Sequence, residues 1–330
     1  MVKKIGSLVN LGFGKETTRG TVVNPTVWMP KLECDFQDKF EQYVDEASFG
    51  TILDSANAKI AKQWSEGTIG GHVGTETLHL ILYALFGAVS SAQIATSGVY
   101  THSFTVAGTS NQHPSLSIHT IGGISDKKYA LCMLESFKIT IEAGKGVKIS
   151  TKWKGKKGVS SSASPSYVAD YLLMARTLTF KKAANLAGLG AASASKIRKF
   201  ELEINKNLED TQLVGDGTGI ELDDITNDLF TIKGSIEAVY EDEASFLDDA
   251  LAGTMKAFRV TLEDTDINIG SSGTNHPKLN FDLAKVSYTE QARNMDNGKI
   301  MAQTLGFKGH YSMSDAQAIV ASLQNVTTSI

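Results

Sequence analysis

The chain has 330 residues, 42% of them hydrophobic and 21% charged, so it can fill one large core or two ordinary ones. Its formal net charge of −4 argues against a generally basic nucleic-acid-binding protein. Residues 1–14 lack the apolar run of a signal peptide, and the most apolar segment, 78–89, is too short to span a bilayer. We therefore expect a protein made in a cytoplasm and soluble there, with no membrane partner.

The first forty residues are expected to form an extended arm. The stretch 14–21 is polar and turn-prone, and Pro25 and Pro30 disfavour a helix. Trp28 and Met29 are apolar residues in this polar context. We favour their packing into their own domain over the alternative, which is docking on a neighbouring subunit.

The first half of the chain combines predicted strands with one helix. Thr75 is placed to cap this helix, Glu76 suits its first turn, and Gly87 suits its end after the apolar run to Phe86. A Gly-Lys-Gly sequence starting at Gly144 predicts a hairpin turn. Strands are predicted at 32–38, 64–73, 103–107, 116–121, 137–142 and 147–153, with a long acidic loop or hairpin at 40–62.

The same order of elements recurs after a serine-rich, basic segment at 154–166 that has the composition of a linker. A long acidic loop is expected at 205–228, followed later by a helix that opens at Glu241 and closes at Gly253. A short amphipathic helix is predicted at 314–323. Strands are predicted at 199–204, 230–239, 258–262, 279–283, 285–289 and 299–308, the last after a turn at 296–298.

Short sequence matches accompany this repeated order. Gly-Thr-Ile at 67–69 precedes the first helix as Gly-Ser-Ile at 234–236 precedes the second. Asn-Gln-His-Pro at 111–114 has a partner in Asn-His-Pro at 275–277, and the glycine-bounded stretch 144–155 has one in 298–309. The alternative is chance similarity between β-rich sequences. We predict a tandem duplication of domain-sized modules, 1–160 and 199–330, with a linker at 161–198.

No constellation of catalytic residues is evident in the sequence. The stretches 188–190 and 215–219 resemble nucleotide- and calcium-binding loops only faintly, and there is no P-loop, nucleophile elbow or zinc motif. We therefore predict a structural protein and not an enzyme, with no catalytic, cofactor-binding or metal-binding residues. The histidines, which we expect to be packing, turn or surface residues, are His72, His79, His102, His113, His119, His276 and His310.

Two charged clusters and two cysteines have simple structural explanations. The lysines of 145–157 surround Trp153 and either contact a nucleic-acid backbone or form the solvated face of a hairpin, which we favour. Cys34 and Cys132 lie in apolar, strand-like runs typical of buried free thiols, and a bridge between them is the alternative. Loop surface and a helix N-terminus account for the acidic residues Asp223, Asp224, Asp228, Glu241, Asp242 and Glu243.

Several stretches of the first 90 residues resemble the tail tube proteins of long-tailed bacteriophages. The run Gly-Lys-Glu-Thr-Thr-Arg-Gly-Thr at 14–21, then Pro-Thr at 25–26 and Trp-Met-Pro at 28–30, is similar to the opening of these proteins. The segment 45–54 resembles the acidic loop of the family. Lys-Gln-Trp-Ser-Glu-Gly at 62–67, followed by the leucine-rich helix to Gly87, is the most specific part.

The resemblance implies a mainly β fold with flanking helices, built as two tandem β-sandwich or barrel modules. It implies subunits that form rings with a continuous inner barrel, and stacked rings that make a hollow tube for DNA delivery. Family members with one module use six chains per ring, so this two-module chain would need three, as in the trimeric, pseudo-sixfold tubes of a minority of these phages. The implied partners are other copies of the chain, tail tip and terminator proteins, and a tape measure protein in the lumen.

The implied location is the virion tail, after synthesis in the host cytoplasm, and genomic DNA would pass through without specific binding. Because a channel for DNA should not grip phosphates, we expect a neutral or acidic inner wall, with the lysines of 145–157 mostly elsewhere. The alternative function is a two-domain β-rich binding or baseplate module of a phage or a cell surface, which would also lack catalytic motifs. An enzyme with a non-local active site is a third hypothesis.

Overall fold

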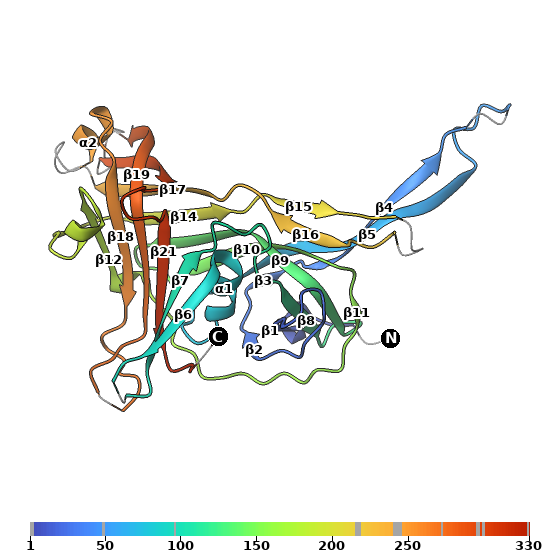
Figure 1. Cartoon of the computed structure of the whole chain (residues 1–330), viewed down its shortest axis with the longest axis horizontal. Coiled ribbons are helices and arrows are strands. Elements are labelled where there is room, and N and C mark those ends of the chain that lie inside the picture. The colour runs from blue at the N-terminus through green and yellow to red at the C-terminus, as the bar shows by residue number, and fades with distance from the viewer. Residues whose placement is uncertain are drawn as a thin grey trace.

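The computed structural model describes residues 3–47, 50–95, 97–214, 219–239, 246–271, 273–294, 298, 301–328 and 330. The chain is built mainly from antiparallel strands, which confirms the predicted fold class (Figure 1). Within the described residues, two short α-helices accompany them, α1 (His79–Phe86) and α2 (Leu247–Leu251). No helix within the described ranges has the length and apolar character needed to cross a membrane.

A continuous antiparallel sheet runs through both halves of the chain. It passes from the first half, residues 3–160, into the second half, residues 161–330, where β9 pairs with β14. We call this the central sheet. Its strands in spatial order are β4 (Gln37–Asp45), β5 (Asn57–His72), β10 (Lys148–Gly155), β9 (Lys127–Glu142), β14 (Lys199–Asn205), β17 (Thr231–Val239), β20 (Ala302–His310) and β19 (Lys278–Asn294).

Further strands complete each half. In the first half, β3 (Glu33–Cys34) pairs with β5, and β11 (Val159–Ser160), β8 (Leu116–Ile121), β1 (Asn10–Lys15) and β2 (Val27–Met29) extend the sheet from β9. In the second half, β18 (Lys256–Glu263), β12 (Leu178–Ala183) and β13 (Ala194–Ser195) extend it from β19. The other side of β19 pairs with β21 (Ile319–Asn325), which leads to β7 (Tyr100–Val106) and β6 (Gly87–Gln93) of the first half. The two halves therefore also pair with each other outside the central sheet, through β21 and β7.

The core lies on one face of the central sheet and continues from one half into the other. Strand β10 alternates buried Ile149, Thr151 and Trp153 with exposed or half-buried neighbours, as period-two patterning requires. The Trp153 ring packs 5.6 Å from that of Phe13, and the Phe200 ring stacks 5.8 Å from that of Phe307 (centroid distances). A single hydrophobic cluster includes residues of both halves.

The predicted first helix is present, but it begins later than expected. Gly87 ends it in the left-handed conformation, with a φ of 90°, as predicted. The N-cap is Leu78 rather than Thr75, so that part of the prediction was wrong. The backbone N–H groups of Thr75 and Glu76 are bound by the Tyr171 carbonyl and an Asp170 carboxylate oxygen, so they form a docked turn ahead of the helix.

The predicted C-terminal helix is a strand, β21. Apolar residues at 316, 319, 320 and 323 fit a helical face, but Ile319, Ala321 and Leu323 also alternate with period two, and these three are buried. The open edges of β19 and β7 each pair with this segment along six residues, which decides between the two patterns.

The other predicted elements agree with the structure in most places. The segment 40–62 is a hairpin, and the strands expected at 279–283 and 285–289 form one strand, β19. Strand β12 lies inside the range 161–198 expected as a linker, and it pairs with β18 over its whole length. The helix start at Glu241 and most of the turn at 296–298 lie outside the described residues. Trp28 and Met29 are 4% and 2% exposed and are buried within the chain itself, where the Trp28 ring lies beside that of Tyr167.

Candidate functional site

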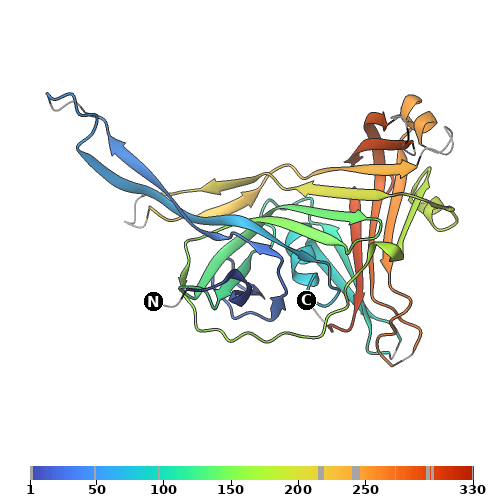
Figure 2. The ribbon, with the colours of Figure 1, turned by 180° about the vertical axis from the view of Figure 1, so that it is seen from behind.

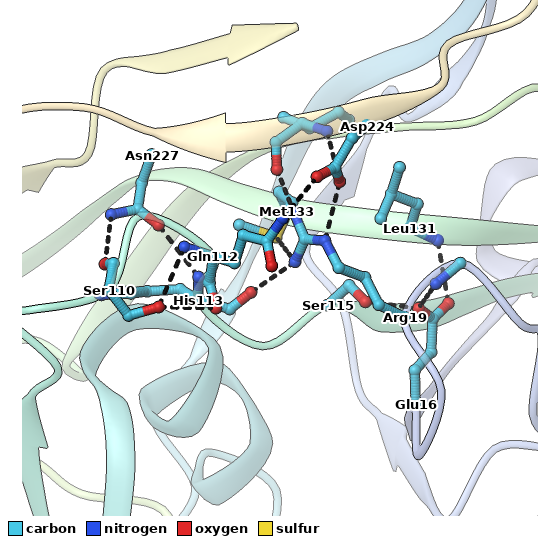
Figure 3. Close-up of polar contacts among 12 residues, drawn as sticks. Glu16, Arg19, Ser110, Gln112, His113, Ser115, Leu131, Met133, Asp224 and Asn227 are labelled. Carbon is cyan, nitrogen blue, oxygen red and sulfur yellow. Dashed lines mark hydrogen bonds and ion pairs between the residues drawn. The ribbon is translucent and has the colours of Figure 1, made fainter. Parts of the chain in front are cut away.

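A buried carboxylate holds the N-terminal segment 15–20 in place. Glu16 is 9% exposed and accepts hydrogen bonds from the backbone N–H groups of Gly20 (2.8 Å) and Leu131 (2.9 Å). The hydroxyls of Ser115 (2.5 Å) and Ser117 (3.1 Å) also donate to it. Four donors from three parts of the first half thus converge on one side chain, and Figure 3 shows part of this arrangement. The segment is a fixed part of the fold.

Arg19 extends this anchor into the second half of the chain (Figure 3). Its Nε lies 2.8 Å from Oδ1 of Asp224, and its Nη1 donates to the His113 carbonyl at 2.6 Å. Its Nη2 donates to the carbonyl of Ile225. Asp224 and Ile225 belong to β16 (Asp224–Asn227), which forms a hairpin with β15 (Leu208–Thr211). One guanidinium therefore connects the N-terminal segment, a first-half loop and a second-half strand.

The loop 110–113 reinforces the same contact. Asn227 Oδ1 accepts from the backbone N–H of His113 at 3.0 Å, and the Gln112 amide donates to Asp224 Oδ2 at 3.1 Å. The Asn227 backbone N–H donates to the Asn111 carbonyl. Asp224, expected to be a surface charge, is thus a binding partner between the two halves.

Lys206 lies fully buried beside this cluster, just after β14. Its Nζ donates to the Ala84 carbonyl at 2.9 Å, in the last turn of α1, where a cation is electrostatically favoured. Burial, followed by the positive charge of Arg19, lowers the pKa of Lys206 to about 7. Burial also lowers the pKa of His113 to about 4, with a smaller contribution from Lys206. The contact between the two halves therefore buries two basic side chains, Lys206 and His113, whose lowered pKa values favour their neutral forms.

Four of the other histidines make structural hydrogen bonds. His102 bridges the Ser91 hydroxyl and the Asn325 side chain, and His119 bridges Ser161 and the Val23 carbonyl. His276 and His310 bind the Ile267 carbonyl and the Ser287 hydroxyl. Across the described part of the chain, no three metal-ligating side chains cluster. Cys34 and Cys132 are both free thiols, Cys132 being fully buried.

Three of the six lysines of 145–157 lie beside carboxylates. Lys152 contacts Glu66 and Glu135, each at 3.1 Å, Lys145 contacts Glu142 at 2.7 Å, and Lys154 contacts Asp210 at 2.8 Å. These short ion pairs on the polar side of β10 agree with a solvated hairpin face better than with a free phosphate-binding patch.

The two end strands of the central sheet each have an edge with no partner among the described strands. One is the outer edge of β3 and β4, which pair only with β5. The other is the edge of β19 over residues 287–292, where only β20 pairs with it among the described strands. Open edges of this kind offer backbone hydrogen-bonding groups to another chain.

The hairpin β4–β5 extends far beyond the body of the molecule (Figures 1 and 2). We call its outer part, residues 37–66, the projecting hairpin. It carries large apolar side chains in solvent: Phe40 and Tyr43 are 65% and 67% exposed, and Ile60 is 44% exposed. Such a concentration of exposed apolar side chains is typical of a protein contact.

Sequence patterns located the N-terminal segment but not its partners. The stretch 14–21 stood out through its resemblance to a family, whereas Ser115, Leu131 and Asp224 lie far away in the sequence and carry no local signal. The buried state of Lys206 was likewise missed, because a lysine after a strand is normally exposed.

A comparison with protein families places these features in context. The family model described as Phage tail tube protein matches residues 6–309 of the 330. None of the curated proteins compared with the chain gives a significant match. The family match covers the N-terminal segment, both open edges and the projecting hairpin, and it confirms the resemblance noted in the sequence. The chain therefore belongs to the phage tail tube protein family and is a structural component of a phage tail.

Proposed function

We propose that the chain is a tandem duplication, that three copies form a ring of six related modules, and that stacked rings form a tube through which DNA passes. Each module would contribute four strands to a closed inner barrel. Tail tip, terminator and tape measure proteins would be further partners in the virion. The observation that carries this proposal is the repeated strand pairing within the central sheet.

The two halves pair their strands in the same register. In the projecting hairpin, Gln42 lies opposite Ile60 and Val44 opposite Ala58. In the second-half hairpin, Leu208 lies opposite Asn227 and Asp210 opposite Ile225, with the same spacing along both strands. Likewise Gly67 pairs with Trp153 as Gly234 pairs with Phe307. Matching registers in separate strand pairs support a duplication over chance similarity.

Irregularities recur at matching places as well. The β9–β10 pairing skips Glu135, one residue after Leu134, which faces Trp153. The β19–β20 pairing skips Thr289, one residue after Tyr288, which faces Phe307. A bulge interrupts the ladder and bends a strand, so its recurrence supports a common origin for the two units.

The order of strands supports ring closure. The order β3/β4, β5, β10, β9 in the first half is followed by β14, β17, β20, β19 in the second. Neither end strand of this series has a further partner strand in the part of the chain that the structure describes, and closure into a barrel removes open edges. The contact between β9 and β14 then serves as the pattern for contacts between chains.

We place the polar face of the central sheet toward the channel, because the core covers its other face. Antiparallel register brings similar numbers of lysines and glutamates onto this polar face, which makes the wall close to neutral, as expected from the sequence. Lys148 and Lys152 lie on it, however, so the proposal revises the expectation that these lysines lie elsewhere. The side chains are Lys138, Lys148, Lys152, Lys199, Lys233 and Lys308 with Glu66, Glu142, Glu201, Glu203, Glu237 and Glu290.

Electron microscopy of the assembled protein tests the proposal. We expect hollow tubes whose rings have threefold symmetry and a sixfold appearance at low resolution. A protein that stays monomeric at high concentration, with no tubes in a phage lysate, would refute it. Rings of six chains would refute the proposed stoichiometry but would agree with the proposed tube.

A further inference from the structure

The contact between the two halves of one chain indicates how two copies bind each other. We propose that the edge β3–β4 and the projecting hairpin of one copy bind the second half of an adjacent copy, as β14 and the hairpin β15–β16 bind the first half of their own chain. The partner is a second copy of this chain. This inference rests on the proposed duplication and adds residue-level contacts to it.

The contact within the chain has two parts. In the first, β14 pairs with β9 over seven residues, from Lys199 opposite Glu142 to Asn205 opposite Ser136. In the second, the hairpin β15–β16 lies over the first half, where Leu222 and Ile225 share a buried cluster with Leu131 and Met133. Asp210 of this hairpin binds both Lys62 and Lys154. Strand pairing and a docked hairpin thus act together.

Because the registers of the two halves match, the pairing of β14 with β9 predicts how strands of two copies pair. Residues 33–39 take the place of 199–205, because Glu33 faces Gly70 as Lys199 faces Glu237. Residues 290–292 take the place of 136–138, because Ser136 and Glu290 each follow the skipped residue of their strand. Lys39 of one copy then lies opposite Glu290 of the next, and Gln37 opposite Ala292. Lys39 and Glu290 are both exposed and of opposite charge.

The same registers predict how the projecting hairpin of one copy docks on the second half of the next copy. Val44 takes the place of Asp210, and Leu229 takes the place of Lys62, which precedes Gly67 by the same spacing as Leu229 precedes Gly234. The ion pair of Asp210 with Lys62 is thus replaced by two apolar side chains between copies, and Lys308 takes the place of Lys154. Val44 is 40% exposed and Leu229 is 71% exposed in a single chain. Phe40 and Ile60 of the projecting hairpin, also exposed, would be covered by the same contact.

Disulfide trapping in assembled tubes tests the strand register. In a full-length Cys34→Ser background, Gln37→Cys and Ala292→Cys place two thiols on directly opposed residues, about 4.5–5.5 Å apart at Cα, which a disulfide can span. The control pairs Gln37→Cys with Glu290→Cys, shifted by two residues along the strand and too far for a bridge. Oxidation should yield covalent dimers and trimers only for the first pair.

A charge exchange tests the docked hairpin. Val44→Asp should reduce tube formation at least tenfold, because it replaces the apolar contact with Leu229 by a carboxylate that only Lys308 can pair. Leu229→Lys alone should also reduce assembly. The double variant should restore assembly, since it recreates the pair formed by Asp210 and Lys62. Circular dichroism of the unassembled variants should match wild type, because both side chains are exposed in the single chain.

The outcomes separate this inference from the proposed function. Wild-type tubes that show no cross-link for the Gln37–Ala292 pair, or as much for the shifted pair, overturn the register. Val44→Asp that assembles as well as wild type, or a double variant no better than the single ones, overturns the docked hairpin. Failure of the wild-type chain to form tubes refutes the proposed function itself.

Discussion

The buried lysine at the contact between the two halves leads to a quantitative prediction about pH. Lys206 is fully buried, and its ordinary pKa of 10.5 is lowered to about 7. The unfolded chain therefore keeps a proton between pH 7 and 10.5 that the folded chain has lost. Stability should rise with pH across this window, and the full cost of burying the charge should be present below pH 7.

The expected magnitude follows from the size of this pKa change. One proton difference between the folded and unfolded states contributes about 1.4 kcal/mol per pH unit. From pH 7 to pH 10 the free energy of unfolding should therefore increase by about 4 kcal/mol through Lys206 alone. The substitution Lys206→Met removes this contribution while keeping most of the apolar volume. It also leaves the Ala84 carbonyl without its donor, which costs about 1 kcal/mol at every pH.

Urea unfolding of the unassembled protein between pH 6 and pH 10 measures the effect. The difference in unfolding free energy between wild type and Lys206→Met should change by about 4 kcal/mol over the window, with wild type gaining as pH rises. Other titrating groups are common to both proteins and cancel in the difference. If the unfolding free energies of the two proteins differ by a constant amount from pH 7 to pH 10, Lys206 does not change protonation there, and the reasoning is refuted.

Further predictions concern the N-terminal anchor, the end of α1 and the buried thiol. Glu16→Ala leaves four donors without their acceptor, so we expect a loss of about 3 kcal/mol and faster tryptic cleavage after Arg19 in limited proteolysis; an unchanged cleavage rate would contradict the anchoring role. Gly87→Ala should cost about 1–3 kcal/mol in thermal unfolding, because φ is 90° and a new Cβ would lie 2.9 Å from that of Ala107. The control Gly144→Ala has φ of 81° but open space, so it should cost less, and equal losses would argue against the steric contribution. Cys132, fully buried with its pKa raised well above 9.0 by burial, should react with a thiol reagent only on unfolding, and rapid labelling of this residue in the native protein would contradict the buried assignment.

Local patterns in the sequence were sufficient for most strands and for the first helix. Alternation along β10 and β14 predicts which side chains are buried, because a strand beside a core must place every second residue inward. The glycine at position 87 marks the helix end, because its left-handed conformation disfavours other residues. These features depend on near neighbours in the chain, so composition and spacing carry enough information.

Predictions from such patterns were wrong where the same residues fit more than one kind of local structure. The apolar residues of 316–323 suit a helix, yet the unpaired edges of β19 and β7 draw this segment into a strand. The range 161–198 was expected to be a linker, yet β12 within it pairs with β18. In both places a distant strand edge supplies hydrogen bonds that no local pattern encodes.

The sequence by itself determined the β-rich class, the repeated order of elements and the resemblance to tail tube proteins. Only the tertiary structure decided that β9 pairs with β14, that Glu16 and Arg19 are held by residues from both halves, and which strand edges remain open. The physical reason is that burial periodicity is a local property of a strand. The choice of partner depends on which hydrogen-bonding edges and charged groups the rest of the chain brings within reach.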